Sequence, residues 1–180
     1  MKNKNKIWIW LTIVILVMLG AIGGKKYMDM KTQEKDYQDG IAIIQNYVSD
    51  YLVKNYQGIE KIEWQGIGVE YRNSPTHGAS LFGNYVDTDV KVFVTEDKYF
   101  IINFLLTEET DYDSDLKKYV KLDSLNSQNT DVVINGELTD AIRRAELKTD
   151  KLKFEKMKKS KNGSPTAKVV YNLELHELKY

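Results

Sequence analysis

The chain has 180 residues, with 26 Lys and Arg against 26 Asp and Glu, and it contains no cysteine. The lack of cysteine excludes thiol nucleophiles, disulfides and thiolate metal sites. The balanced charge, spread over many segments, lacks the long-range positive field that draws proteins to nucleic acid. A domain of roughly 150 residues builds one core without a metal, so we expect no cofactor and no nucleic-acid partner.

An uncharged apolar run occupies residues 7–24 and reads IWIWLTIVILVMLGAIGG, with lysines on both sides. At about 1.5 Å per residue it spans roughly 27 Å, close to the ~30 Å hydrocarbon core of a bilayer. The run predicts a signal-anchor or transmembrane segment over residues 1–26 and makes the lipid bilayer the first expected partner. The expected membrane-spanning residues include Ile7, Trp8, Trp10, Leu11, Ile15, Leu19 and Gly24.

Two other interpretations of this run compete with an anchor. Ala21 and Gly23 have the spacing of a signal-peptidase site, but the run is longer than the ~7–15 apolar residues of a usual signal peptide. A buried helix of the domain would not be apolar on every face. A short tail before the run and a long domain after it are typical of a signal-anchor whose C-terminal part is translocated. We therefore expect a single-pass membrane protein whose domain, residues 27–180, lies outside the cytoplasm.

Residues 31–56 carry apolar side chains at steps of four and three, which is the period of one helical face. The pattern predicts an amphipathic helix that ends near Gly58 and packs on the domain's own sheet, with a short coiled coil as the alternative. The apolar positions are Tyr37, Ile41, Ile44, Val48, Tyr51 and Leu52.

Strand formers dominate residues 59–106. Residues 59–72 predict a strand with a bulge or bend at Gly66 and Gly68. Residues 73–80 read NSPTHGAS and predict a turn. Residues 81–94 predict a second strand, in which Val90, Val92 and Val94 share a face. A short polar reversal and the segment YFIINFLL then predict a hairpin.

The C-terminal part is less regular. We expect a loop with a short helical or irregular stretch around residues 116–125, a short strand at 132–134, and a helix capped by Thr139. Residues 148–161 fit helix or strand equally. Residues 167–178 alternate and predict a strand with one wet face. The fold class is therefore α+β, with an amphipathic helix packed on a mostly antiparallel sheet.

Three aspartates at alternate positions have the spacing with which a calcium-binding loop of the EF-hand kind begins. Asp111, Asp113 and Asp115 have that spacing, but Leu116 and Leu122 stand where such a loop needs glycine and a bidentate glutamate. A solvated acidic loop explains the segment better, and we expect no metal site.

The two histidines lie far apart, at His77 and His176. His77 has hydroxyl residues nearby, at Ser74, Thr76 and Ser80, but no nucleophile elbow surrounds them. We therefore expect no catalytic residues and no enzymatic activity.

A lysine-rich stretch near the C-terminus is a candidate contact for an anionic wall polymer or for lipid headgroups. A simple solvated face is the competing interpretation, because Glu and Asp interrupt the stretch. The candidate contacts are Lys151, Lys153, Lys156, Lys158, Lys159 and Lys161.

The stretch YLVKNYQGIEKIEWQGIGVE (residues 51–70), together with the Lys-rich start, the apolar anchor and the following hairpin, resembles uncharacterised small membrane-anchored proteins of low-GC Gram-positive bacteria. The resemblance covers mainly residues 1–107 and implies no activity and no functional residue. Our leading hypothesis is a non-enzymatic surface protein that binds another protein, as an accessory or immunity-type factor. The alternatives are a module that binds anionic polymer or lipid headgroups, and a hydrolase without a recognisable motif.

Overall fold

The computed structural model describes the backbone of residues 2–72 and 83–178, and the side chains of residues 24, 25, 27–72 and 83–178. Two compact units cover residues 1–36 and 37–180, and helix α1 runs from Lys2 to Asn55. Within the residues whose side chains the structure describes, no helical stretch is long and apolar enough to cross a membrane. Of the seven residues expected to span the membrane, only Gly24 is described beyond its backbone. The anchor therefore stays a prediction.

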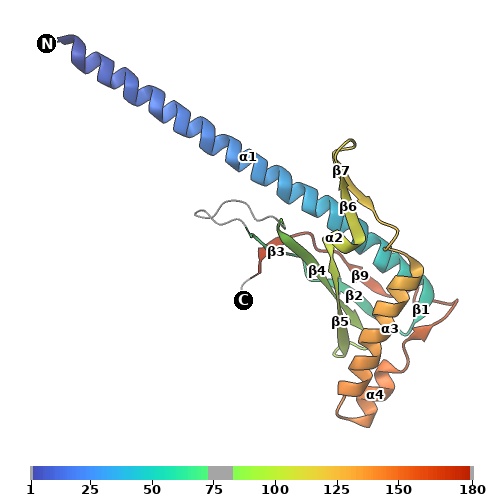
Figure 1. The fold of residues 1–180 in the computed structure, drawn as a ribbon. Coiled ribbons are helices and arrows are strands. Elements are labelled where there is room, and N and C mark those ends of the chain that lie inside the picture. The colour runs from blue at the N-terminus through green and yellow to red at the C-terminus, as the bar shows by residue number, and fades with distance from the viewer. Residues whose placement is uncertain (1, 73–82, 179–180) are drawn as a thin grey trace. The chain divides into compact units, whose positions relative to one another are not determined.

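The second unit is an α+β domain, and this coarse fold class is confirmed (Figure 1). After α1, its helices are α2 (Leu106–Glu109), α3 (Ser127–Arg144) and α4 (Lys148–Phe154). Its strands are β1 (Tyr56–Gln57), β2 (Lys61–Trp64), β3 (Ile67–Glu70), β4 (Tyr85–Phe93), β5 (Tyr99–Leu105), β6 (Thr110–Asp113), β7 (Lys118–Lys121), β8 (Lys158–Lys159), β9 (Lys168–Val170) and β10 (Leu175–Glu177).

The main sheet has six strands and is built around β4. On one side β4 pairs antiparallel with β5, and on the other it pairs antiparallel with β2 and, further along, with β3. Outside these, β9 pairs parallel with β2 and β10 pairs parallel with β3. The sheet is thus antiparallel around β4, as predicted, but mixed as a whole, because β9 and β10 pair parallel. Two small antiparallel pairs, β1 with β8 and β6 with β7, complete the unit.

The predicted bend at the glycines is confirmed, and it divides one predicted strand into β2 and β3. Gly66 has φ +103°, a conformation that side-chain-bearing residues rarely adopt. A Cβ there would lie 2.8 Å from the carbonyl oxygen of Glu174. The Ile67 N–H donates to that same oxygen at 2.9 Å, so the neighbouring strand is held against the bend and leaves no room for a side chain.

One face of the sheet is buried, and the other, which we call the uncovered face, carries half-buried and exposed side chains in the described chain. The predicted face of α1 is confirmed, because five of its six apolar side chains are buried: Tyr37, Ile41, Ile44, Val48 and Leu52. Alternate residues of β2, β4 and β5 complete this core. The remaining strand residues lie on the uncovered face, as period-two alternation requires.

Three predictions for the C-terminal half are wrong. The acidic segment forms the β6–β7 hairpin instead of a loop, and Asp113 Oδ1 accepts the N–H groups of Asp115 and Leu116 at 2.9 Å in its turn. Residues 132–134 belong to α3 and form no strand, because Asn126 caps that helix by accepting the N–H groups of Gln128 and Asn129. Residues 167–178 form two short strands, interrupted opposite the bend at Gly66.

Candidate functional site: a groove beside strand β5

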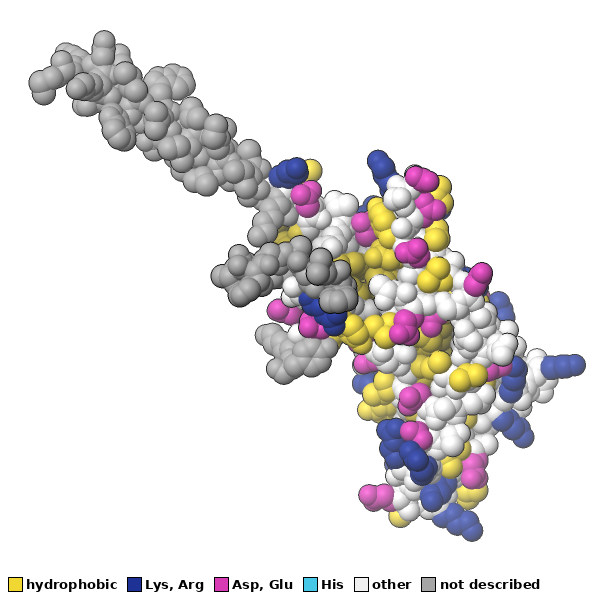
Figure 2. Space-filling model, in the orientation of Figure 1, with side chains coloured by type: hydrophobic (Ala, Val, Ile, Leu, Met, Phe, Trp, Pro, Cys, Tyr) yellow, Lys and Arg dark blue, Asp and Glu magenta, His cyan; other side chains and the backbone are white. Residues whose placement is uncertain are grey.

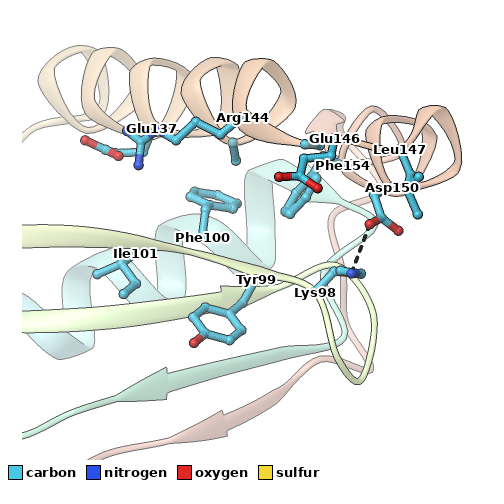
Figure 3. A pocket seen from close by; sticks show the side chains of 12 residues that line it. Lys98, Tyr99, Phe100, Ile101, Glu137, Arg144, Glu146, Leu147, Asp150 and Phe154 are labelled. Carbon is cyan, nitrogen blue, oxygen red and sulfur yellow. Dashed lines mark ion pairs between the residues drawn. The ribbon is translucent and has the colours of Figure 1, made fainter.

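A cavity of about 570 Å³ lies between the start of β5 and the helices α3 and α4 (Figure 3). Four consecutive residues, 98–101, line it from the hairpin and β5, and Figure 3 shows Phe100 and Phe154 directed into the space between strand and helices. The side chains of α3 that line it are Glu137, Ala141 and Arg144. The groove therefore has a strand along one side and a helical wall along the other.

The sequence of β5 explains why this side of the groove is apolar. The strand reads YFIINFL and carries no charge. Phe100, Ile102 and Phe104 are buried in the core, whereas Tyr99 and Ile101 are 41% and 43% exposed. Leu147, between α3 and α4, is also exposed, at 63%, and lines the same cavity.

Strand β5 pairs only with β4, so its other edge has no strand partner in the described chain. Val94 and Lys98 lie opposite each other where the β4–β5 hairpin turns, and the Val94 N–H donates to the Lys98 carbonyl at 2.9 Å. These two residues are therefore a hydrogen-bonded pair of the ladder. Because hydrogen-bonded and non-bonded pairs alternate in antiparallel ladders, residues 100, 102 and 104 bond to β4. The N–H and C=O groups of Tyr99, Ile101 and Asn103 therefore point away from β4.

The charged groups at the groove are partly neutralised within the domain. Lys98 Nζ lies 3.0 Å from Asp150 Oδ2, and this hydrogen bond and charge raise the pKa of Lys98. Arg144 pairs with Asp140 at 3.0 Å. Within the described residues, Glu137 and Glu146 form no ion pair, and both line the groove. Two carboxylates at the rim thus remain available.

A second polar cluster ties α1, α3 and β8 together. Asp131 Oδ1 accepts hydrogen bonds of 2.8 Å from the hydroxyls of Tyr51 and Tyr56, and Lys159 bonds to Asp131 Oδ2. Burial alone raises the pKa of Asp131, but the bonds from Lys159, Tyr51 and Tyr56 outweigh it and hold that pKa below its usual value. Burial and the Asp131 carboxylate raise the pKa of Tyr56. The cluster therefore holds α1, β1, α3 and β8 together, and we call it the Asp131 clamp. Tyr56 is fully buried, so its hydroxyl is not open to solvent.

The structure separates the six candidate lysines. Lys153 lies 3.7 Å from Asp150 and 3.9 Å from Asp97, and Lys159 is bound by Asp131. Figure 2 shows basic side chains interspersed with acidic and apolar ones over the α3–α4 end of the domain. In the described part of the chain, four of the candidates form no ion pair: Lys151, Lys156, Lys158 and Lys161.

The uncovered face of the sheet carries a small acidic cluster. The Asn103 amide donates to Asp87 Oδ2 at 3.1 Å and to Asp89 Oδ1 at 2.9 Å. Burial, followed by the charge of Asp89, raises the pKa of Asp87, although the hydrogen bond from Asn103 and, less strongly, the charge of His176 oppose this shift. No group of three or more His, Asp or Glu residues in the described chain is arranged to hold a metal ion. His77, with its neighbouring hydroxyl residues, lies outside the described residues.

Sequence reasoning missed the groove, although it predicted the hairpin that forms one side of it. The available signal was the uncharged strand YFIINFL, but nothing local shows that this strand lies at an edge. No family model, curated protein or solved structure matches the chain.

Proposed function

We propose that this chain is a non-enzymatic, membrane-anchored module that binds another protein through the groove beside β5. The observation that carries the proposal is the open edge of β5: Tyr99 and Ile101 are exposed on the uncovered face of the sheet, and Leu147 is exposed in the cavity on the other side of the strand. Apolar centres with a charged rim are typical of protein-binding surfaces. The rim here is supplied by Glu137, Glu146 and the Lys98–Asp150 pair.

Site-specific photo-crosslinking in the native cell tests the binding site. A photoreactive amino acid replaces Leu147 in the full chain, and in a control chain it replaces Val132, which is 68% exposed on α3 but does not line the groove. We expect a discrete crosslinked protein from position 147 and none from position 132. Equal products from both positions, or none from 147, would contradict the proposal.

The membrane anchor is supported by the apolar run of residues 7–24 and the lysines on both sides of it. Protease treatment of intact cells tests the proposed orientation. Antibodies against the last strand and against the N-terminus report which end is cleaved. We expect the C-terminal signal to disappear while the anchor is retained, and protection until lysis would reverse the topology.

A second candidate function is binding of an anionic wall polymer or of lipid headgroups through the lysine-rich stretch. It is favoured by one observation, which is that Lys156, Lys158 and Lys161 are exposed and have no ion pair within the described residues. Contacts of this kind weaken as salt rises.

The test of this candidate changes those three lysines to Gln and measures retention on anionic polymer and on vesicles with anionic lipid, at low and high salt. The matched control changes Lys117, Lys118 and Lys121, which are exposed around the β6–β7 hairpin. Loss confined to the first variant and to low salt supports polymer or lipid binding. Equal retention of both variants and of the native chain counts against it.

A further inference from the structure

The open edge of β5 specifies the shape of what binds there. Tyr99, Ile101 and Asn103 direct their N–H and C=O groups away from β4, and no other described residue forms a hydrogen bond to these groups. From this, and resting on the proposed function, we infer that the partner contributes an extended segment that adds to the sheet as a new strand beside β5.

Only an extended backbone offers donors and acceptors at the same two-residue spacing as those groups. A docked helix keeps its backbone hydrogen bonds to itself and would leave the outward groups of β5 unpaired. Strand addition therefore accounts for the edge, and the apolar side chains alone do not distinguish these two kinds of partner.

Strand β5 also lacks the features that normally prevent edge pairing. Natural edge strands carry charged residues, proline or a bulge that discourage another strand. The seven residues of β5 contain no charge and no proline, and their register with β4 is continuous from Tyr99 to Leu105. An edge left in this state is suited to pairing with another chain.

The side chains around the edge specify the chemistry of the added strand. On the uncovered face its residues would pack beside Tyr99 and Ile101, where apolar and β-branched side chains fit best. On the groove side they would approach Glu137 and Glu146, which have no ion pair among the described residues. The segment therefore alternates apolar residues with polar ones that include Arg or Lys rather than Asp or Glu.

The test selects binders from a random phage-displayed peptide library against the full chain in detergent. Selected peptides are then measured against Ile101→Pro, which removes one outward N–H, and against Ile101→Thr, which keeps it in a strand-forming residue. We expect alternating, basic peptides that bind Ile101→Thr nearly as well as the native chain. Binding to Ile101→Pro should be about tenfold weaker or worse, since a backbone hydrogen bond is lost and the strand approach is blocked.

A second measurement does not depend on how well the proline variant folds. The selected peptide is synthesised twice, with N-methyl groups on its odd or on its even residues. In an added strand only one of these sets faces β5, so we expect one peptide to lose binding and the other to retain it. Equal loss or equal retention, or a failure to enrich any extended peptide, overturns the inference.

The outcomes separate the two proposals. A partner crosslinked from position 147 whose binding is unchanged in Ile101→Pro supports the proposed function and overturns strand addition. The absence of any crosslinked partner contradicts the proposed function itself. If the crosslinked protein is a second copy of this chain, the edge pairs with itself, and the inference of a distinct partner segment fails.

Discussion

The hydroxyl of Tyr56 donates a 2.8 Å hydrogen bond to Asp131, and so joins the residue after α1 to the first turns of α3. Tyr56 is fully buried, so its hydroxyl depends on this carboxylate for an acceptor. Replacing Asp131 by Ala should lower the free energy of unfolding by about 1–3 kcal/mol, the cost of an unsatisfied buried polar group. Urea denaturation of the full chain in detergent measures the loss.

The control for this variant is Asp140→Ala, since Asp140 pairs only with the exposed Arg143 and Arg144 in the described chain. That change should alter stability by less than about 0.5 kcal/mol. Equal losses in the two variants would show that the clamp contributes no more than a surface ion pair.

The same carboxylate makes stability depend on pH. Its folded pKa lies below the usual value, so it contributes stability above the unfolded pKa of about 3.9, and this contribution is lost as pH falls through the folded pKa. Asp131→Asn keeps an oxygen for the tyrosines but does not titrate. We expect the native chain to lose more stability than Asp131→Asn between pH 7 and pH 3, and parallel losses would contradict this.

Two glycines with opposite surroundings test the bend in the sheet. Gly66→Ala forces a left-handed backbone on alanine and places its Cβ 2.8 Å from the Glu174 oxygen, so we expect a loss of about 2 kcal/mol or more. Gly136→Ala lies within α3 with nothing near its Cβ and should gain about 0.5–1 kcal/mol. Thermal denaturation compares the two, and a neutral Gly66→Ala would mean that the bend relaxes easily.

The parts of the fold that could be predicted are those with a local period. The face of α1 and the β4–β5 hairpin follow from spacing within one segment, and both are correct. Residues 132–134 were assigned wrongly because three β-branched residues imitate a strand. In α3 they serve different faces, with Val132 exposed and Ile134 buried. The cap that overrides this pattern is Asn126, six residues upstream.

The remaining features depend on contacts between distant segments. The parallel pairing of β9 with β2 and of β10 with β3 joins residues about a hundred positions apart, and no local pattern specifies it. The groove has the same origin, because β5 becomes an edge only once β9 and β10 occupy the opposite side of the sheet. The sequence shows that β5 is uncharged, but it does not show that β5 lies at the edge of the sheet.

A buried hydroxyl provides a further test of the core. Trp64 is buried, and its indole N–H donates to Ser49 Oγ of α1 at 2.9 Å. Ser49→Ala should cost about 1–3 kcal/mol, because the indole loses its acceptor away from water. Ser114→Ala, at an exposed position in the β6–β7 turn, is the control and should be nearly neutral. Similar stabilities for both variants would indicate that the indole finds another acceptor.

Adjacent proline substitutions test the direction of the backbone groups of β5 without any partner. The N–H of Ile102 bonds to β4, whereas the N–H of Ile101 points to the open edge. Ile102→Pro should therefore cost about 3 kcal/mol or more, because it removes a ladder hydrogen bond as well as a fully buried side chain. Ile101→Pro should cost clearly less, since proline is tolerated where the N–H of an edge strand faces outward.

Ile102→Val and Ile101→Val separate the loss of side-chain volume from the backbone effect in this comparison. Chemical denaturation of all four variants gives the backbone contribution at each position as the difference between proline and valine. A larger backbone cost at position 101 than at 102 would mean that the ladder has the opposite phase. In that case the N–H and C=O groups of residues 100, 102 and 104 would point to the open edge, and the outward direction inferred for those of Tyr99, Ile101 and Asn103 would be wrong.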